Sequence, residues 1–371
     1  MKKLIIVVLA FISSFFLLLA VATSVSASNP HQTDILERGE YIANIAGCID
    51  CHTPFQKEYQ DPAHMNLDQL KTLSFNLGAT QDRENKLLAG GRPFDLGPAG
   101  VLLTRNLTPD KETGIGSWSD EQIKIAIKSG TSAYGKLLFP VMPYHVYNTM
   151  ADADLDALVA YLRSIKPVVN NIPKSKISTE GLSALPYKTG LVAPDPSDKA
   201  ARGAYLVNSV MGCTDCHTPV DPSTGVPQTD KYLAGRQPYE GPWGIVYGGN
   251  ITPDHDTGIG TWTEAEVKRA FMSGVRKDGR RLIFMPWFNY VTLQAADADA
   301  VVYYLKNVLP AVKNEIPAPA LKEGFQEMAP EVPNQPSAGS SVLSPAILVV
   351  VGVAIILFVS VGMALLRRRS A

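Results

Sequence analysis

The chain has 371 residues, which is enough for about two domains with additional segments. Hydrophobic residues make up 46% of the chain and the formal net charge is −1. Five basic residues lie in or beside the two apolar ends, at Lys2, Lys3 and Arg367–Arg369, so the remainder is mildly acidic. This balance argues against nucleic-acid binding, because a protein of that class needs a basic face.

Residues 1–27 have the pattern of a signal peptide. Met1-Lys2-Lys3 precedes an apolar run from Leu4 to Ala22, and the small-x-small site Val25-Ser26-Ala27 follows. This order predicts export with cleavage after Ala27. The length of the apolar run leaves an uncleaved anchor as the alternative.

An internal repeat organises the middle of the chain. The separation between copies is 165 residues at His52/His217 but 144 at Trp118/Trp262, so the first copy carries about 21 extra residues between His52 and Arg92. We predict these segments: signal peptide 1–27, domain 28–175, linker 176–197, domain 198–318, flexible tether 319–345, transmembrane helix 346–366 and cytoplasmic tail 367–371.

Helices with long loops are expected in both copies. Amphipathic helices at Leu36–Ala46 and Ala201–Met211 precede the cysteine motifs described below. Capping boxes predict helices that start after Ser119 and Thr263. The last helices are expected at Asp154–Ile165 and Asp297–Val308. No convincing strand alternation is present, so the predicted fold class is all-α and loop-rich, with a C-terminal transmembrane helix.

Two Cys-x-x-Cys-His motifs, Cys48-x-x-Cys51-His52 and Cys213-x-x-Cys216-His217, carry the chemistry. This spacing is the signature of c-type haem attachment: the two thiols form thioethers to one haem and the adjacent His coordinates its iron. A four-cysteine zinc site, or redox-active and disulfide-bonded pairs, leave both histidines unexplained. We therefore predict two covalently bound haem c groups, with His52 and His217 as iron ligands.

Met142 and Met285 are the predicted second axial ligands. Each stands in a Met-Pro pair before the last helix of its copy, 90 and 68 residues after the respective histidine. Met/His ligation raises the reduction potential of a haem. Ordinary core packing is the alternative role for a methionine, and His145 is a competing ligand to Met142.

Two arginines are further candidates. Arg92 and Arg236 have the geometry to hydrogen-bond haem propionates, although each could equally bond loop carbonyls. The extra residues of the first copy, which include His64 and Met65, could form a docking surface or cover the first haem.

The C-terminal run Ala346–Leu366 has 21 uncharged residues, about the length that crosses a bilayer, and Arg367–Arg369 follow. The arginines predict a cytoplasmic tail. The predicted location is the cytoplasmic membrane, with one C-terminal span and the haem domains on the extracytoplasmic side. A buried soluble helix is the alternative.

Residues 34–318 resemble the class I cytochrome c domains of membrane-bound dehydrogenase cytochrome subunits, such as those of bacterial alcohol and gluconate dehydrogenases. The resemblance rests on the two haem motifs, the Met-Pro pairs, and the Asn-x-Thr-Pro-Asp strings that begin at Asn106 and Asn250. It implies electron transfer with a redox partner: a dehydrogenase, a quinol oxidoreductase or a terminal oxidase. The chain departs from that pattern by holding two motifs rather than three and by its C-terminal apolar run.

Three functions are compatible with two haem sites. An electron carrier would have both irons closed by two axial ligands. A haem enzyme, peroxidase-like or acting on sulfur compounds, would need one displaceable axial ligand. A structural subunit would have no need of redox centres. The similar Met-Pro loops favour the electron carrier, as a subunit of an oxidoreductase complex rather than a catalyst by itself.

Overall fold

The computed structural model describes residues 30–61, 64–96, 99–175 and 177–325. All of these belong to one compact unit, which extends to Ala329. The predicted signal peptide, transmembrane range and tail lie outside the described residues. Side chains from both repeats join one hydrophobic core, so the core does not mark a boundary between the repeats. The boundary between domains 28–175 and 198–318 stays a prediction.

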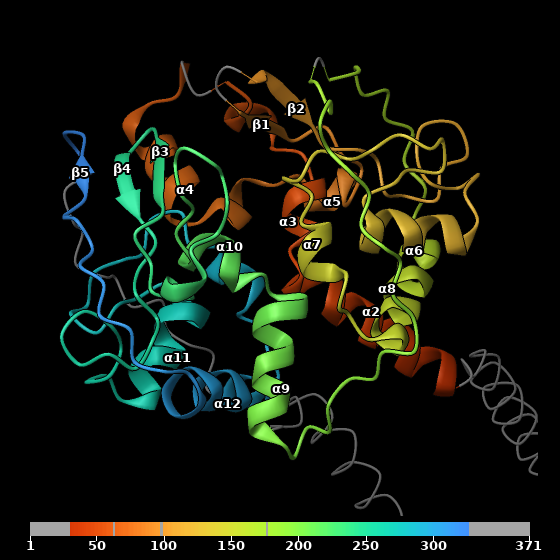
Figure 1. Cartoon of the computed structure of the whole chain (residues 1–371). Helices are drawn as coiled ribbons and strands as arrows, with labels where there is room; N and C mark the ends of the chain where they lie inside the picture. The colour runs from red at the N-terminus through yellow and green to blue at the C-terminus, as the bar shows by residue number, and fades with distance from the viewer. Residues whose placement is uncertain (1–29, 62–63, 97–98, 176, 326–371) are drawn as a thin grey trace, which may run out of the picture. The chain divides into compact units, whose positions relative to one another are not determined.

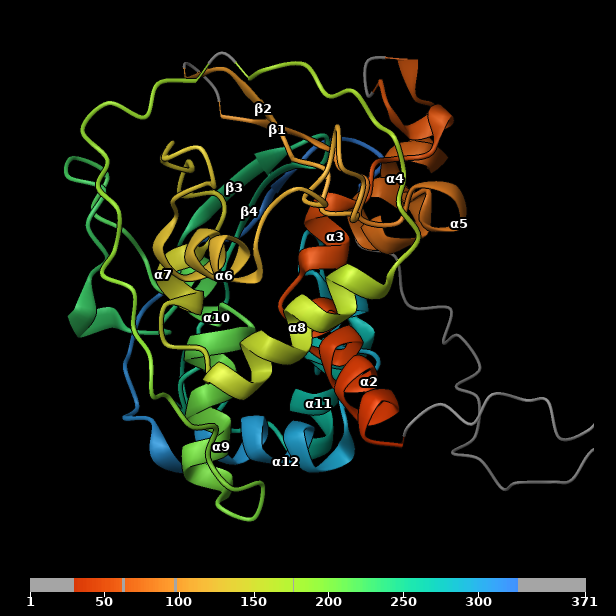
Figure 2. The same cartoon turned by 90° about the vertical axis from the view of Figure 1, so that its right-hand side faces the viewer.

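Each repeat is built around a pair of packed helices (Figures 1 and 2). In the first repeat α2 (Pro30–Ile45) packs on α8 (Asp152–Ser164), and in the second α9 (Lys199–Tyr205) packs on α12 (Ala295–Tyr303). A glycine makes each contact close. A Cβ atom on Gly39 would lie 2.0 Å from the Ala157 carbonyl oxygen, and one on Gly203 would lie 2.1 Å from that of Ala300. Only glycine lets the backbones approach this closely.

The remaining helices are short and are joined by long loops. Both predicted capping boxes are present, with Ser119 capping α6 (Asp120–Ser129) and Thr263 capping α11 (Glu264–Ser273). The other helical segments are α3 (Cys48–His52), η1 (Lys57–Tyr59), α4 (Leu67–Phe75), η3 (Leu77–Thr80), α5 (Arg83–Lys86), α7 (Tyr144–Tyr147), η5 (Leu206–Val210), α10 (Cys213–His217), η6 (Thr229–Lys231), η7 (Trp287–Asn289) and η8 (Tyr304–Val308).

The described residues form two small antiparallel sheets, so the prediction of an all-α fold is wrong. In the first repeat β1 (Pro93–Asp95) pairs with β2 (Val101–Leu103). In the second, the order is β3 (Pro238–Gly241), β4 (Gly244–Tyr247), β5 (Ala320–Leu321). Strands of two to four residues are too short to show a period-two pattern in the sequence. The strand β5 also lies inside the range 319–345 that was expected to be tether.

The prediction of a C-terminal membrane-spanning helix is also corrected. No helix in the part of the chain that the structure describes has the length and apolarity needed to cross a membrane. The range predicted for the span, 346–366, is outside that part. The predicted location at the cytoplasmic membrane, which depended on this helix, is corrected with it.

A reciprocal set of buried polar contacts joins the two repeats. Arg38 forms two hydrogen bonds to Asp154, and Arg202 forms two to Asp297, each within its own repeat. Each aspartate also accepts a hydrogen bond from a tyrosine of the other repeat. The Tyr205 hydroxyl donates to Asp154 and the Tyr41 hydroxyl to Asp297, both at 2.6 Å. The repeats are therefore cross-linked by two equivalent sets of charge-assisted hydrogen bonds.

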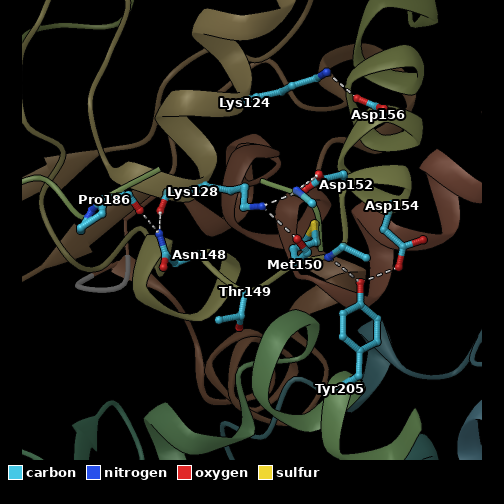
Figure 3. A network of polar contacts seen from close by, with 12 residues as sticks. Lys124, Lys128, Asn148, Thr149, Met150, Asp152, Asp154, Asp156, Pro186 and Tyr205 are labelled. Carbon is cyan, nitrogen blue, oxygen red and sulfur yellow. Dashed lines mark hydrogen bonds and ion pairs between the residues drawn. The ribbon is translucent and has the colours of Figure 1, made fainter. Parts of the chain in front are cut away.

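The connection between the repeats is held against the first repeat (Figure 3). The fully buried ammonium of Lys128 donates to the Met150 carbonyl oxygen at 3.1 Å and to Asp152 at 3.2 Å. Asn148 donates to the carbonyl oxygens of Lys128 and Pro186, at 2.8 and 2.9 Å. The predicted linker thus has fixed backbone contacts at Pro186.

Two candidate haem-attachment sites

The two Cys-x-x-Cys-His motifs form the short helices α3 and α10, which begin after equivalent turns. Gly47 and Gly212 precede them with φ angles of 75° and 63°. These angles lie in the left-handed region, which glycine adopts without the strain that other residues meet. Just before these glycines the preceding helix of each repeat ends, and the motif helix begins directly afterwards.

Both motif histidines are held in the same way. The Nδ1 atom of His52 lies 2.7 Å from the Arg105 carbonyl oxygen, and that of His217 lies 2.7 Å from the Gly249 carbonyl oxygen. A carbonyl oxygen only accepts, so Nδ1 carries the proton and Nε2 keeps a free lone pair. Metal-binding histidines are commonly oriented by such a bond from the other ring nitrogen.

Burial keeps these histidines in the form that coordinates a metal. Desolvation lowers the pKa of His52 to about 4, against a smaller opposing effect of its hydrogen bond to Arg105. Desolvation also lowers the pKa of His217. Both imidazoles are therefore neutral at neutral pH, as an iron ligand must be.

The four cysteines are all free thiols rather than disulfides. Burial raises the pKa of Cys48, Cys51 and Cys213 to about 12 and raises that of Cys216. Such surroundings suit an uncharged thioether and disfavour the thiolates that zinc requires. In the described ranges, no three or more His, Cys, Asp or Glu side chains are grouped as a metal site. The donor set of each motif therefore fits covalently attached haem c, whereas the four-cysteine zinc alternative has no geometric support.

Arg92 contacts the first motif. It is 7% exposed, and its guanidinium donates to the carbonyl oxygen of Asp50 at 2.8 Å and to its carboxylate at 2.6 Å. Asp50 lies between the two cysteines, so Arg92 braces the motif helix. Its Nε atom is buried without a hydrogen-bond partner among the described residues.

Arg236 is not the structural counterpart of Arg92. The strands β1 and β3 begin at the equivalent prolines Pro93 and Pro238. The residue before each proline is Arg92 in the first repeat and Gln237 in the second, so Arg236 stands one position before the equivalent of Arg92. Arg236 adopts a φ of 81° and donates to the Glu315 carbonyl oxygen at 3.0 Å. The pairing of the two arginines came from the shared residue type, and the alignment shifts by one residue at this point.

Met142 and Met285 both pack against the hydrophobic core, at equivalent places in their repeats. Each begins a tight turn: the amide of Tyr144 donates to the Met142 carbonyl oxygen and that of Trp287 to the Met285 carbonyl oxygen, both at 2.8 Å. His145, the competing ligand, instead hydrogen-bonds Asp215 of the second motif at 2.8 Å. That bond disfavours His145 as an iron ligand of its own repeat.

Tyr147 and Tyr290 were not singled out from the sequence. Both are buried, and their hydroxyls donate to the Ala46 and Met211 carbonyl oxygens just before the two motifs. Desolvation by burial raises the pKa of each well above 10, so both stay neutral. The signal available in the sequence was positional, since each tyrosine stands five residues after its Met-Pro methionine.

The comparisons with known proteins agree with this chemistry. No family model matches the chain. The fructose dehydrogenase cytochrome subunit of Gluconobacter japonicus is 29% identical over 301 residues, which cover 77% of this chain and 55% of the relative. The cytochrome c subunit of the quinone alcohol dehydrogenase of Gluconobacter oxydans is 28% identical over 272 residues, 68% of this chain and 50% of the relative.

A third relative, a dihaem c-type cytochrome of Cereibacter sphaeroides, is 24% identical over 295 residues, 74% of this chain and 86% of the relative. The chain spans about half the length of the two dehydrogenase subunits above. These three relatives are cytochrome c subunits of dehydrogenases and a dihaem cytochrome c. This supports two covalently bound haem c groups in this chain, consistent with electron transfer.

Proposed function

We propose that this chain is a dihaem c-type cytochrome that passes electrons from a dehydrogenase or quinol-oxidising donor to a downstream acceptor. Bound haem c supplies an iron that cycles between the ferric and ferrous states. The observation that carries the proposal is the repeated bond from a motif histidine Nδ1 to a backbone carbonyl, at 2.7 Å in both repeats. This bond leaves the Nε2 lone pair of each histidine free, which is the atom that would coordinate an iron.

Each repeat supplies one complete set of attachment and ligand residues. Cys48 and Cys51 tether the first haem and Cys213 and Cys216 the second. His52 and His217 would coordinate the two irons through Nε2. Met142 and Met285 would supply the other iron ligand in each repeat, which would leave neither iron open to a substrate. The loop position shared by the two methionines supports this role.

The two sites lie within one core, which favours electron exchange inside the chain. A Cβ atom on Gly47, at the first motif, would lie 3.5 Å from Asn289 in the segment after Met285. A Cβ atom on Gly212, at the second motif, would lie 3.7 Å from Val146 in the segment after Met142. Each motif therefore abuts the loop that follows the methionine of the other repeat.

A dehydrogenase is the proposed electron donor. The support is that two relatives are cytochrome subunits of fructose and alcohol dehydrogenases. The chain would thus act as the electron-transfer subunit of a complex whose other subunit performs the oxidation.

Carbon monoxide binding tests the closed irons. The ferrous holoprotein is expected to keep a six-coordinate low-spin spectrum under carbon monoxide. Met142→Ala and Met285→Ala are each expected to open one haem, which then binds carbon monoxide. Ready binding by the unmodified protein would favour the haem enzyme, and unchanged spectra in both variants would refute the methionine ligands.

A further inference from the structure

The residues that make the first repeat longer contact the second repeat. We call residues 54–87, between Thr53 and Leu88, the insertion segment. In the second repeat the equivalent residues Thr218 and Leu233 are separated by a much shorter stretch. Thr53 and Thr218 both accept a hydrogen bond from the amide of their partner leucine at 3.1 Å, so the segment's ends are equivalent in the two repeats.

The insertion segment carries α4, whose C-terminal end meets the Met285 loop. The last four carbonyl groups of an α-helix have no partner within the helix. Two of these groups in α4 accept hydrogen bonds from the second repeat. The Phe284 amide donates to the Ser74 carbonyl oxygen at 3.0 Å, and the Trp287 indole Nε1 donates to that of Phe75 at 2.8 Å. The helix end and the loop thus satisfy each other, although 212 residues separate Phe75 from Trp287.

A third contact follows directly. Gly78, in η3, faces the ring of Phe288, and a Cβ atom at Gly78 would lie 2.8 Å from Phe288 Cδ2. The insertion segment therefore touches residues on both sides of Met285, at Phe284, Trp287 and Phe288.

The equivalent loop of the first repeat needs no such support. There the Met142 amide donates to the Phe139 carbonyl oxygen at 3.0 Å and closes a turn within the loop. The loop before Met285 is one residue shorter. In it the amide of Phe284, the residue before Met285, donates to the Ser74 carbonyl oxygen of the insertion segment.

The shorter loop also holds Phe284 in an unfavourable backbone conformation. Its φ angle is 68°, in the left-handed region, where a bulky residue is strained. Such a conformation persists only where surrounding contacts impose it. The contacts here are the bond to Ser74 and the packing of the Phe284 ring on Tyr239 and Trp243, with ring centroids 5.0 and 5.3 Å apart.

We propose that the insertion segment of the first repeat is a positioning element for Met285, so that ligation of the second haem depends on a segment of the first repeat. This inference rests on the proposed role of Met285 as an iron ligand. It is a third role beside the two considered from the sequence, a docking surface or a cover for the first haem. Weaker support for the loop would let Met285 leave the iron more readily and lower the reduction potential of the second haem.

Two variants of the holoprotein test the proposal. Trp287→Phe removes the indole donor to Phe75 and keeps an aromatic ring. Gly78→Val pushes against Phe288 from the insertion segment without altering the loop itself. Tyr144→Phe is the matched control, because Tyr144 occupies the position of Trp287 in the first repeat and has no contact with an insertion.

The readouts are carbon monoxide affinity of the ferrous protein and the potentials of the two haems in a spectroelectrochemical titration. Met285→Ala and Met142→Ala identify the signals of the second and first haem. We expect Trp287→Phe and Gly78→Val each to raise carbon monoxide affinity at the second haem by about tenfold and to lower its potential, with the first haem unchanged. The control variant is expected to match the unmodified protein.

The possible failures are distinguishable. If Met285→Ala leaves the spectrum unchanged, the proposed ligand is wrong and the function must be revised. If Met285→Ala opens the second haem but Trp287→Phe and Gly78→Val leave its affinity and potential unchanged, the positioning role is refuted. Loss of covalent haem in Gly78→Val would leave Trp287→Phe, the milder change, to decide.

Discussion

The cross-repeat tyrosines allow a quantitative prediction about how the two repeats are held together. Tyr205 is 8% exposed, and Tyr205→Phe removes only its hydroxyl. That hydroxyl donates to Asp154 at 2.6 Å and accepts from the Ala151 amide at 3.2 Å. A hydrogen bond to a charged group contributes about 1.5–3 kcal/mol, and an unpaired buried amide adds to the loss. We expect the free energy of unfolding to fall by about 3 kcal/mol.

Tyr41→Phe removes the equivalent bond to Asp297 and is expected to lower the free energy of unfolding by about 2 kcal/mol. The double variant would then lose about 5 kcal/mol, comparable to the whole stability of a modest domain. The expected consequence is separation of the repeats, with one unfolding transition becoming two.

Urea unfolding of the holoprotein, followed by far-ultraviolet circular dichroism and by haem absorbance, measures both effects. Tyr134→Phe is the control, because Tyr134 is 73% exposed and Phe keeps its edge contact with Trp118. If the double variant unfolds in one transition at the urea concentration of the unmodified protein, the tyrosines do not join the repeats.

Three further predictions concern single positions. Gly39→Ala places a Cβ atom 2.0 Å from the Ala157 carbonyl oxygen and should lower the free energy of unfolding by about 3 kcal/mol or more in a thermal melt. Burial alone would raise the pKa of Asp297, but hydrogen bonds from Arg202 and Tyr41 outweigh it and lower the pKa. The resulting stabilisation is full above roughly pH 4 and is lost as the pH falls through the folded-state pKa. Asp297→Asn should therefore flatten the acid limb of the stability profile, and an unchanged slope would contradict this. Asn148→Ala removes the side-chain donor to the Pro186 carbonyl oxygen and should speed proteolysis near Pro186 by about tenfold, whereas an unchanged cleavage rate would show that the linker is held by other contacts.

Local signals in the sequence were sufficient for the parts of the fold that are themselves local. The capping boxes at Ser119 and Thr263 gave the starts of α6 and α11, because both partners of a box lie within one turn. The haem motifs gave the cofactor, because attachment needs three residues at a fixed spacing. The short strands β1 to β5 were missed, since so few residues show no period.

Long-range contacts account for the rest. Asp154 and Asp297 looked like ordinary helix residues, and their bonds to Tyr205 and Tyr41 join residues 51 and 256 positions apart. The exchange of partners between repeats cannot be seen within one copy. The contact of Phe284 with Ser74 also joins two repeats and has no local sequence signal. The only indication is that the loop before Met285 is one residue shorter than the loop before Met142. Arg236 was mispaired because residue type was followed across a one-residue shift.

Coulometric titration of the purified holoprotein tests the central claim most directly. A dihaem electron carrier takes up two electrons per chain, with both absorbed at haem c bands, and returns both to an oxidised soluble cytochrome c. His217→Ala should then retain the first low-spin haem and change the signal of the second alone. Uptake of fewer than two electrons by the unmodified protein, or reduced haem that cannot pass its electrons on, would contradict the account.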